Sequence, residues 1–396
     1  MWLRRCGTAR KGGTVRVGVV GLRRGLQLAV WCRRLGIEVA AVCDIVAERR
    51  AAGREAFPRA FVAARWEELL EQPLDAVVLA HDFDAHAPPA VAFLERGVHV
   101  LSETAACVDA AEGRELIAAA ERSRATYSFA ENYVAHPHVR LLRQAADAGE
   151  LGRISLIEAD YLHGMAPSAV QELTGDPAHW RGRIAATAYC THTLSPVLAL
   201  TGAWPVEVTA FPVDLAEARG AVVMAVRLSS GALALTRHGF LQGEPDSHWS
   251  WVSVRGTRAL AESVRAPGDR AWSVRVRTEA WAASDGRPHE VERTPPALVL
   301  EGEGAAVARG EEGTALILRA FRETVELGTE PLVGVRQAVA ASLVGTAGAE
   351  SLRNGSRPVP LPDFSGGEVP ARGDVERSGG AYAPCAGPSP GAQCPP

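Results

Sequence analysis

The chain has 396 residues, of which 47% are hydrophobic and 22% charged, and a chain of this length is expected to form two domains. Its formal net charge of -4 gives no electrostatic reason to expect nucleic-acid binding, and no apolar run approaches the roughly twenty residues that a membrane helix needs. The seven cysteines contain no Cys-x-x-Cys pair, which predicts neither a disulfide framework nor a zinc site. We therefore expect a soluble, cytoplasmic protein without a bound metal.

The first motif lies in residues 15 to 44. The apolar run Val15 to Val20 precedes the turn Gly21-Leu22-Arg23-Arg24-Gly25, and a helix-like stretch and a second apolar run follow, ending at Asp44. This is the pattern of a dinucleotide-binding βαβ unit, although Arg23 stands where the fingerprint has its second glycine. We predict that the turn approaches a pyrophosphate and that Asp44 binds the adenosine ribose, which favours NAD over NADP. The alternative for Asp44 is a cap of the following helix.

Up to about residue 135 the sequence alternates strand-like and helix-like segments. The run from Leu74 to Ala80 is continuously apolar, which is typical of a strand buried in a parallel sheet. Helices are expected at 87–96 and 109–122, and strands at 98–101 and 126–130. Such alternation implies right-handed crossovers and predicts an α/β fold with a doubly wound parallel sheet.

Beyond Gly152 the pattern changes to consecutive strands without helices between them. We predict strands at 154–161, 206–213, 221–228, 232–238, 249–255 and 272–277. Helices are expected at 138–149, 313–327 and 335–352, with a closing strand at 358–364. These elements predict an α+β domain with a large, open, mainly antiparallel sheet.

The expected organisation has four parts. A flexible N-terminus at 1–14 precedes a dinucleotide-binding domain at 15–135, and a domain for substrate and oligomer contacts follows at 136–365. Residues 366–396 are rich in glycine, proline and serine and have little to bury, so we expect a disordered tail there.

Several short motifs occur in the order and spacing of a known family. Besides the glycine turn and Asp44, they are the loop 80–86, the segment 97–103, Ala130-Glu131-Asn132-Tyr133, the segment 149–152, Trp180-Arg181 and the segment 358–364. From residue 15 to residue 364 the chain resembles the Gfo/Idh/MocA family of NAD(P)-dependent oxidoreductases. The resemblance implies an N-terminal Rossmann domain followed by a mainly antiparallel α/β domain, in agreement with the elements predicted above.

The resemblance also implies roles for individual residues. Gly21, Leu22, Arg23, Arg24 and Gly25 would hold the pyrophosphate, and His81 and His86 lie in a loop that lines the cofactor in the family. Glu103 matches a glutamate beside the nicotinamide, whereas Asn132, Trp180 and Arg181 match positions near the nicotinamide ribose. Thr104 stands where most members have a lysine, and Ala188 stands where many have an aspartate. The chain therefore resembles a lysine-less branch with the motif Ser102-Glu103-Thr104-Ala105.

His192 matches the histidine of the family's substrate pocket and is our candidate acid/base. A histidine titrates near neutral pH, which suits it to take a proton from an alcohol while hydride leaves the same carbon. If this stretch is helical, Tyr189 shares the face of His192 and can bind or relay that proton. The alternative for His192 is a core histidine bonded to a backbone carbonyl.

Two further pairs of residues are open to interpretation. Tyr161 and His163 alternate on one face of a predicted strand, and they either line the pocket or pack in the sheet. His136 and His138 flank Pro137 and are interpreted as loop residues. We expect Glu103, Asn132, Tyr161, His163, Trp180, Arg181, Tyr189 and His192 to meet in one cleft between the two domains.

Three functions are open at this point. The first is an oxidoreductase that moves hydride between NAD and a secondary alcohol or ketone of a sugar, cyclitol or related polyol. The second is an NAD-dependent glycosidase that oxidises C3 of the sugar transiently, as some relatives of the lysine-less branch do, with Tyr161 or His163 in proton transfer. The third is a cofactor-binding protein without catalysis, which Arg23, Thr104 and Ala188 favour. The resemblance also implies a homodimer or homotetramer formed through the second sheet.

Overall fold

The computed structural model describes residues 14–366 except 216–217, 245–247, 267, 270 and 301–304. The flexible N-terminus and the disordered tail that we predicted lie almost entirely outside the described residues. The described residues up to Phe364 belong to one compact unit. The domain boundary expected between residues 135 and 136 stays a prediction.

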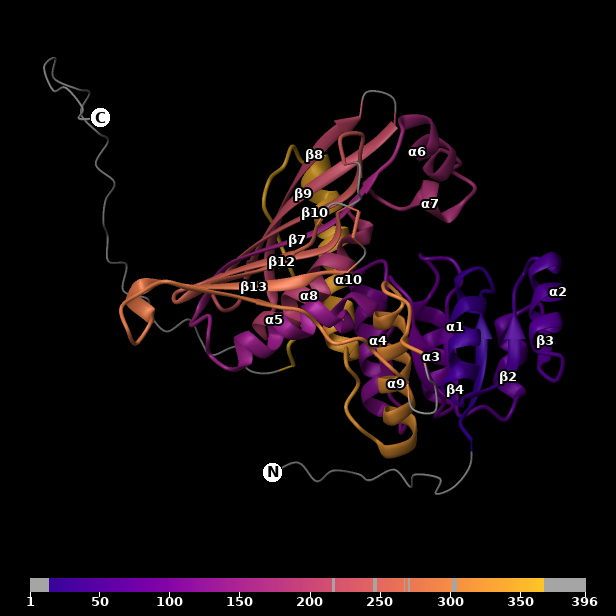
Figure 1. Cartoon of the computed structure of the whole chain (residues 1–396). Helices are drawn as coiled ribbons and strands as arrows, with labels where there is room; N and C mark the ends of the chain where they lie inside the picture. Colours follow the sequence, from indigo (N-terminus) through magenta and orange to yellow (C-terminus); the bar gives the residue numbers. More distant parts are fainter. Residues whose placement is uncertain are drawn as a thin grey trace, which may run out of the picture. The chain divides into compact units, whose positions relative to one another are not determined.

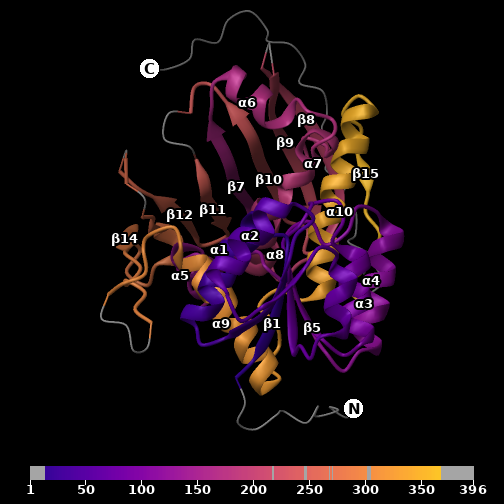
Figure 2. The same ribbon diagram turned by 90° about the vertical axis from the view of Figure 1, so that its right-hand side faces the viewer.

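The first sheet has six parallel strands in the order β3-β2-β1-β4-β5-β6, which confirms the predicted doubly wound α/β fold. Figure 2 shows α1 on one side of these strands and α3 and α4 on the other. The strands are β1 (Arg16–Val20), β2 (Glu38–Cys43), β3 (Phe61–Ala63), β4 (Ala76–Leu79), β5 (His99–Ser102) and β6 (Tyr127–Phe129). The helices are α1 (Arg24–Arg34), α2 (Ala47–Ala56), α3 (Ala87–Glu95) and α4 (Ala110–Arg122), with the 3-10 helix η1 (Trp66–Glu71).

Local sequence explains the clearest of these elements. All four residues of β4 are buried, as the continuous apolar run predicted for a strand covered on both faces. Helix α4 begins after Asp109, whose carboxylate accepts hydrogen bonds from the backbone N–H groups of Ala111 and Glu112. Such an N-cap satisfies donors that the helix itself cannot pair.

The second sheet has nine strands in the order β14-β13-β12-β11-β7-β10-β9-β8-β15. In Figure 1 the labelled strands of this sheet run from β13 through β12, β7, β10 and β9 to β8. Its pairs are antiparallel, as predicted, except that β7 and β10 run parallel at the centre. The strands are β7 (Ile154–Gly164), β8 (Pro205–Leu215), β9 (Ala218–Leu228), β10 (Leu233–Leu241), β11 (Trp249–Gly256), β12 (Ala259–Val264), β13 (Ser273–Thr278), β14 (His289–Arg293) and β15 (Val359–Pro360).

Three strands of this sheet differ from the sequence prediction. β12 and β14 were not predicted, because β12 is built largely from small residues and β14 is a charged, exposed edge strand without apolar alternation. The closing strand is shorter than expected, since only Val359 and Pro360 pair with β8. A proline there is tolerated because β15 lies at the sheet edge.

The helices of the second half lie mainly beside this sheet. They are α5 (Pro137–Asp147), α6 (Pro167–Thr174), α7 (Trp180–Arg183), α8 (Thr191–Thr201), α9 (Glu312–Leu327) and α10 (Val335–Arg353), with the 3-10 helices η2 (Asn132–Ala135), η3 (Ala188–Cys190) and η4 (Ala280–Ala282). Helix α8 contacts β7 and η2, and α10 contacts β8 as well as α4 and β6. These two helices therefore connect the second sheet to the first.

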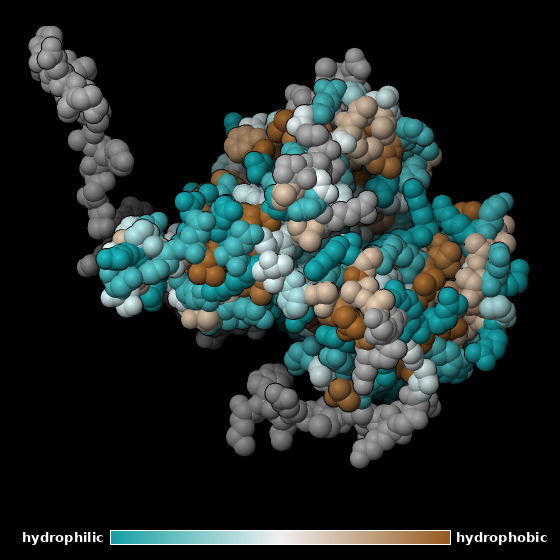
Figure 3. All heavy atoms as spheres, viewed as in Figure 1, coloured by the Kyte–Doolittle hydropathy of each residue, from teal (hydrophilic) through white to brown (hydrophobic). Residues whose placement is uncertain are grey.

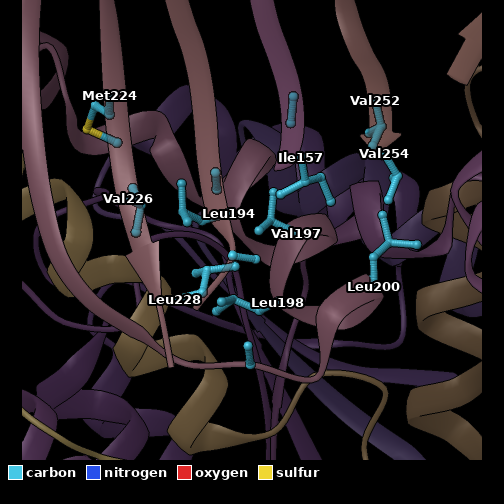
Figure 4. Packing of buried hydrophobic residues seen from close by; sticks show 14 of the residues in the cluster. Ile157, Leu194, Val197, Leu198, Leu200, Met224, Val226, Leu228, Val252 and Val254 are labelled. Atoms are coloured by element: carbon cyan, nitrogen blue, oxygen red, sulfur yellow. The ribbon is translucent and has the colours of Figure 1, made fainter. Parts of the chain in front are cut away.

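The core beneath the second sheet holds α8 in position. Leu194, Val197 and Leu198 of α8 pack in one buried cluster with Ile157 of β7 and Val226 of β9 (Figure 4). Each buried aliphatic side chain contributes about 1.5–3 kcal/mol relative to an exposed one. This packing holds the first turn of α8, which carries His192, against the rest of the site.

The surface drawn in Figure 3 is mostly hydrophilic, and hydrophobic residues form small groups on it. Such groups are ordinary on folded proteins. None of the helices in the described ranges combines the length and the apolar character that crossing a membrane requires.

Candidate functional site

The glycine turn brings backbone close to the end of β4. Gly21 has a φ of +85°, and a Cβ added there would lie 2.5 Å from the carbonyl oxygen of Ala80. Helix α1 begins three residues later, and no side chain caps its N-terminus. Free N–H groups at the start of a helix bind phosphate well, so the turn fits the predicted pyrophosphate despite Arg23, whose side chain is exposed.

Asp44 is buried beside this turn. One carboxylate oxygen accepts from the backbone N–H of Leu22 at 2.7 Å and the other from that of Val46 at 2.8 Å. The Val46 bond lies just before α2, whose N-cap residue is Val46 without a side-chain cap, so the structure does not confirm the capping alternative for Asp44. Because each carboxylate oxygen has two lone pairs, ribose hydroxyls can still bind. The ribose role stays a prediction.

His81 and His86 support the loop after β4. His86 donates from Nδ1 to the carbonyl of Ala105 at 3.0 Å, and His81 donates from Nε2 to the carbonyl of Ala85 at 2.8 Å. Their rings meet edge to face at 4.7 Å. Burial lowers the pKa of both, that of His86 to about 3, so both rings are neutral at neutral pH. Contact with a cofactor stays a prediction for both.

Glu103, at the end of β5, pairs with the first residue of α1. Arg24 Nε lies 3.0 Å from Glu103 Oε1, and Arg24 Nη2 donates to the Thr314 hydroxyl at 3.3 Å. The next residue, Thr104, shares a 2.7 Å hydrogen bond with the hydroxyl of Thr191 in α8. Thr104 therefore ties the end of β5 to the helix of His192.

Glu131 and His192 form a buried pair that sequence reasoning missed. His192 Nδ1 lies 2.9 and 3.0 Å from the two carboxylate oxygens of Glu131, whose side chain is fully buried. An ionised carboxylate only accepts hydrogen bonds, so Nδ1 donates and Nε2 remains to take a proton. The alternative of a core histidine bonded to a backbone carbonyl is wrong, because His192 bonds to the side-chain carboxylate of Glu131. An acid two residues after the end of β6 and directly before the predicted Asn132 was the available signal.

Aromatic rings surround His192. Tyr133 stacks on it at 4.6 Å, and Tyr161 meets it edge to face at the same centroid distance. Tyr161 also contacts His163 at 4.6 Å, so both predicted residues of β7 lie on the face of the strand that holds His192. Burial raises the pKa of Tyr161 and lowers that of His163 to about 4. At neutral pH the phenol is therefore protonated and the His163 imidazole neutral.

Tyr189 and α7 complete the cluster. Tyr189 lies in η3, which leads directly into α8, and its ring centroid is 5.5 Å from that of His192. Its hydroxyl accepts from Arg181 Nη1 at 3.2 Å, and Phe83 stacks on Trp180 at 5.7 Å. The structure thus brings together Tyr161, His163, Trp180, Arg181, Tyr189 and His192, with Asn132 directly after Glu131. Asp44 and His81 lie beside the glycine turn that contains Gly21, and the ring of His86 contacts that of His81.

His136 lies between η2 and α5 and is a loop residue as predicted, whereas His138 lies in α5, and both residues support the cluster. His136 donates to or accepts from the Ser250 hydroxyl at 2.6 Å, and its ring stacks on Tyr133 at 4.6 Å. His138 lies in α5, is 3% exposed, and donates to the carbonyl of Ser250 at 2.6 Å. The loop prediction was wrong for His138, because Pro137 starts a helix here.

The sheet order, the glycine turn and the open helix N-terminus are those of a dinucleotide-binding Rossmann fold. A family model described as "Oxidoreductase family, NAD-binding Rossmann fold" matches residues 15–131, and the "GFO/IDH/MocA C-terminal domain" matches residues 139–262. The chain belongs to the Gfo/Idh/MocA family and is an NAD-dependent oxidoreductase, with NADP a weaker alternative.

The curated relatives are named as glycoside hydrolases and not as dehydrogenases. An alpha-N-acetylgalactosaminidase of Bacteroides fragilis is 24% identical over 397 residues, which cover 88% of this chain and 90% of that protein. The glycosyl hydrolase family 109 protein 3 of Phocaeicola vulgatus is 28% identical over 211 residues, or 48% of this chain. That alignment spans only 38% of the Phocaeicola protein.

Solved structures share the fold. A levoglucosan dehydrogenase, in complex with NADH and levoglucosan, superposes with a TM-score of 0.74 at 16% identity and covers 89% of this chain and all of the other. An aldose-aldose oxidoreductase from Caulobacter crescentus gives a TM-score of 0.67 at 17% identity, over 88% of this chain and 100% of that one.

Proposed function

We propose that this oxidoreductase transfers hydride between NAD and a secondary alcohol or ketone of a sugar, cyclitol or related polyol. The observation that carries the proposal is the pair of Glu131 and His192, because a base oriented by a carboxylate is the group that dehydrogenation of an alcohol requires. The sugar-acting names of the solved neighbours support the substrate class.

Each group of the cluster has a task in this proposal. Bound NAD supplies the hydride acceptor. His192 Nε2 takes the hydroxyl proton, and Glu131 stabilises the positive charge that then develops on the ring. The protonated phenol of Tyr161 donates a hydrogen bond to the substrate oxygen. Glu103, held by Arg24, lies at the end of β5 beside the predicted nicotinamide position.

The test is turnover of a panel of sugars and cyclitols, followed by the absorbance of reduced nicotinamide. We expect at least one member to reduce NAD, and Glu131→Gln to slow that reaction about tenfold or more, because the neutral amide no longer stabilises the imidazolium. Glu55→Gln, on the exposed side of α2, is the matched control and should behave as wild type. Nucleotide binding without turnover on the whole panel would favour the non-catalytic alternative.

A second candidate function is an NAD-dependent glycosidase. The names of the curated relatives support it, as does the presence of Tyr161 and His163 beside His192, since elimination at the sugar needs a second proton-transfer group. Cleavage of a nitrophenyl glycoside with no net change in reduced nicotinamide would support this function. Steady accumulation of reduced nicotinamide without glycoside cleavage would reject it.

The assembly and location of the protein belong to the same proposal. We propose a homodimer or homotetramer formed through the second sheet, and a cytoplasmic location, as expected from the sequence and the family resemblance. Light scattering of the purified chain tests the assembly, and a monomeric mass at micromolar concentration would contradict it.

A further inference from the structure

Arg181 is held rigidly at the edge of the cluster. Its guanidinium lies 4.4 Å from the centroid of the Trp180 ring, and its Nη1 donates to the hydroxyl of Tyr189 at 3.2 Å. Its backbone carbonyl accepts from Nη1 of Arg219 at 3.1 Å. The guanidinium therefore has a defined orientation beside the candidate catalytic groups.

The other edge of this guanidinium makes no hydrogen bond to any residue that the structure describes. Arg181 Nε is buried and makes no hydrogen bond to the described residues, while the bond to Tyr189 uses Nη1 only. Nε and Nη2 form the side-on fork of an arginine, which binds a carboxylate through two parallel hydrogen bonds.

Two other arginines of the chain show which group this pair of donors binds. Arg237 holds Asp160 through Nε and Nη2, each at 2.7 Å, and Arg183 holds Asp84 through the same two atoms at 3.0 and 3.1 Å. Both partners are carboxylates. Arg181 presents the identical pair of donors inside the cluster.

The acids around the site already have cationic or imidazole partners. Glu103 pairs with Arg24, Glu131 with His192, and Asp84 with Arg183. None of the ion pairs found among the described residues involves Arg181 or Arg219. A partly buried guanidinium without a counter-charge is unfavourable, so a ligand that brings an anion is favoured.

We propose that Arg181 binds a carboxylate of the substrate, and that the substrate is therefore a sugar acid or its glycoside. This deepens the proposed function and rests on it. Arg181 contacts Tyr189, whose ring lies 6.0 Å from that of Tyr161, so the acid group binds close to the carbinol that is oxidised. The inference assigns Arg181 to binding of the substrate, whereas the family resemblance implied that Arg181 lies near the nicotinamide ribose.

Matched pairs of ligands test the proposal by calorimetry on the NAD-loaded protein. The pairs are glucuronate with glucose, galacturonate with galactose and gluconate with glucitol, and glucose phosphate is added as a second kind of anion. We expect at least one acid to bind about tenfold more tightly than its neutral partner, because a charge-assisted bidentate pair is worth that much or more. No acid preference in any pair contradicts the proposal, and so does preference for the phosphate over every carboxylate.

Variants separate the substrate role from the cofactor role. Arg181→Gln should abolish the acid preference and leave NAD affinity within about threefold of wild type, and Arg181→Lys should restore only part of it because lysine has no fork. Arg140→Gln, exposed on α5, is the matched control. Equal loss of NAD binding in Arg181→Gln would overturn the assignment.

The readouts also distinguish this inference from the proposed function. Oxidation of neutral sugars as fast as of their acids would leave the oxidoreductase proposal intact and reject the carboxylate. Binding of sugar acids that depends on Arg181, without reduction of NAD by any ligand, would support the carboxylate site and reject the oxidoreductase proposal.

Discussion

At the scale of single residues, the bond between Glu131 and His192 decides what the site can do. The carboxylate fixes which ring nitrogen carries the hydrogen, and only 11% of the His192 side chain is exposed. A partly enclosed base exchanges its proton with a bound alcohol rather than with bulk water. The pair therefore gives His192 one acceptor nitrogen and one orientation.

Replacement of His192 by glutamine should separate catalysis from cofactor binding. We expect His192→Gln to reduce turnover about a hundredfold or more, because a positioned acid/base contributes that much, while NAD affinity stays nearly unchanged. Reduced-nicotinamide formation and NAD titration measure the two quantities. His289→Gln, which changes an exposed histidine on β14, is the control. A fully active His192→Gln protein would remove His192 from the mechanism.

Asp44 should control the choice of cofactor. Asp44→Ala removes the acceptor for the Leu22 N–H and the predicted ribose contact, so NAD affinity should fall about tenfold or more and the preference over NADP should relax. Asp44→Asn keeps an acceptor for Leu22 without the charge and should lose less NAD affinity. Titration with both nucleotides measures the effect, and unchanged affinities would show that Asp44 only supports the turn.

At the scale of elements, α9 positions the turn that follows Glu131. Gly313 of α9 packs so closely on η2 that an added Cβ would lie 2.5 Å from the Asn132 carbonyl oxygen and 2.4 Å from His136 Cδ2. Neither neighbour is the free end of a flexible side chain. The approach of α9 to η2 therefore depends on a residue without a Cβ.

Gly313→Ala should thus affect both stability and turnover. Overpacking of this kind costs about 1–3 kcal/mol, and the shift of η2 should also move Glu131 and lower the rate. Thermal unfolding and reduced-nicotinamide formation are the measurements. Gly243→Ala is the control, because a Cβ there meets nothing within 4 Å. Wild-type behaviour of Gly313→Ala would mean that α9 does not position Glu131.

Local patterns predicted some elements well and others not at all. The apolar run of β4 and the alanine-rich segment of α4 are properties of adjacent residues, so the sequence predicts these two elements directly. The parallel pairing of β7 with β10 depends on how the intervening helices and strands pack, and no local pattern records it.

The same distinction applies to the site. Tyr161 and His163 could be chosen from residue type and spacing, and His192 from the family resemblance, whereas Glu131 meets His192 only because α8 returns to it from 61 residues further along the chain. The ion pair of Arg24 with Glu103 joins residues that are 79 apart in the sequence, and the sequence did not predict it either. Such contacts are tertiary, and residue chemistry alone does not select them.

At the scale of the whole molecule, buried neutral histidines should make the fold sensitive to acid. Burial lowers the pKa of His86 to about 3 and the pKa values of His138 and His238 to about 4. In the unfolded chain these groups protonate near pH 6.5, so the unfolded state binds more protons below that pH. Their contribution to stability is complete above about pH 6.5 and is lost as the pH falls toward about 4.

Urea unfolding at a series of pH values measures this effect. The free energy of unfolding should fall by up to about 1.4 kcal/mol per pH unit for each such histidine between about pH 6.5 and about pH 4. A transition midpoint that stays constant from about pH 7 to about pH 5 would contradict the burial of these rings as neutral groups.

A crystal structure of the chain with NAD bound tests the central claim most directly, because it shows which side chains face the carbon that exchanges hydride. The account predicts the pyrophosphate at the start of α1, the nicotinamide beside Glu103, and its C4 atom facing the space between Tyr161 and His192. A nicotinamide whose C4 atom faces away from His192, or a His192 ring that lies outside the cofactor site, would contradict the account even though the fold is right.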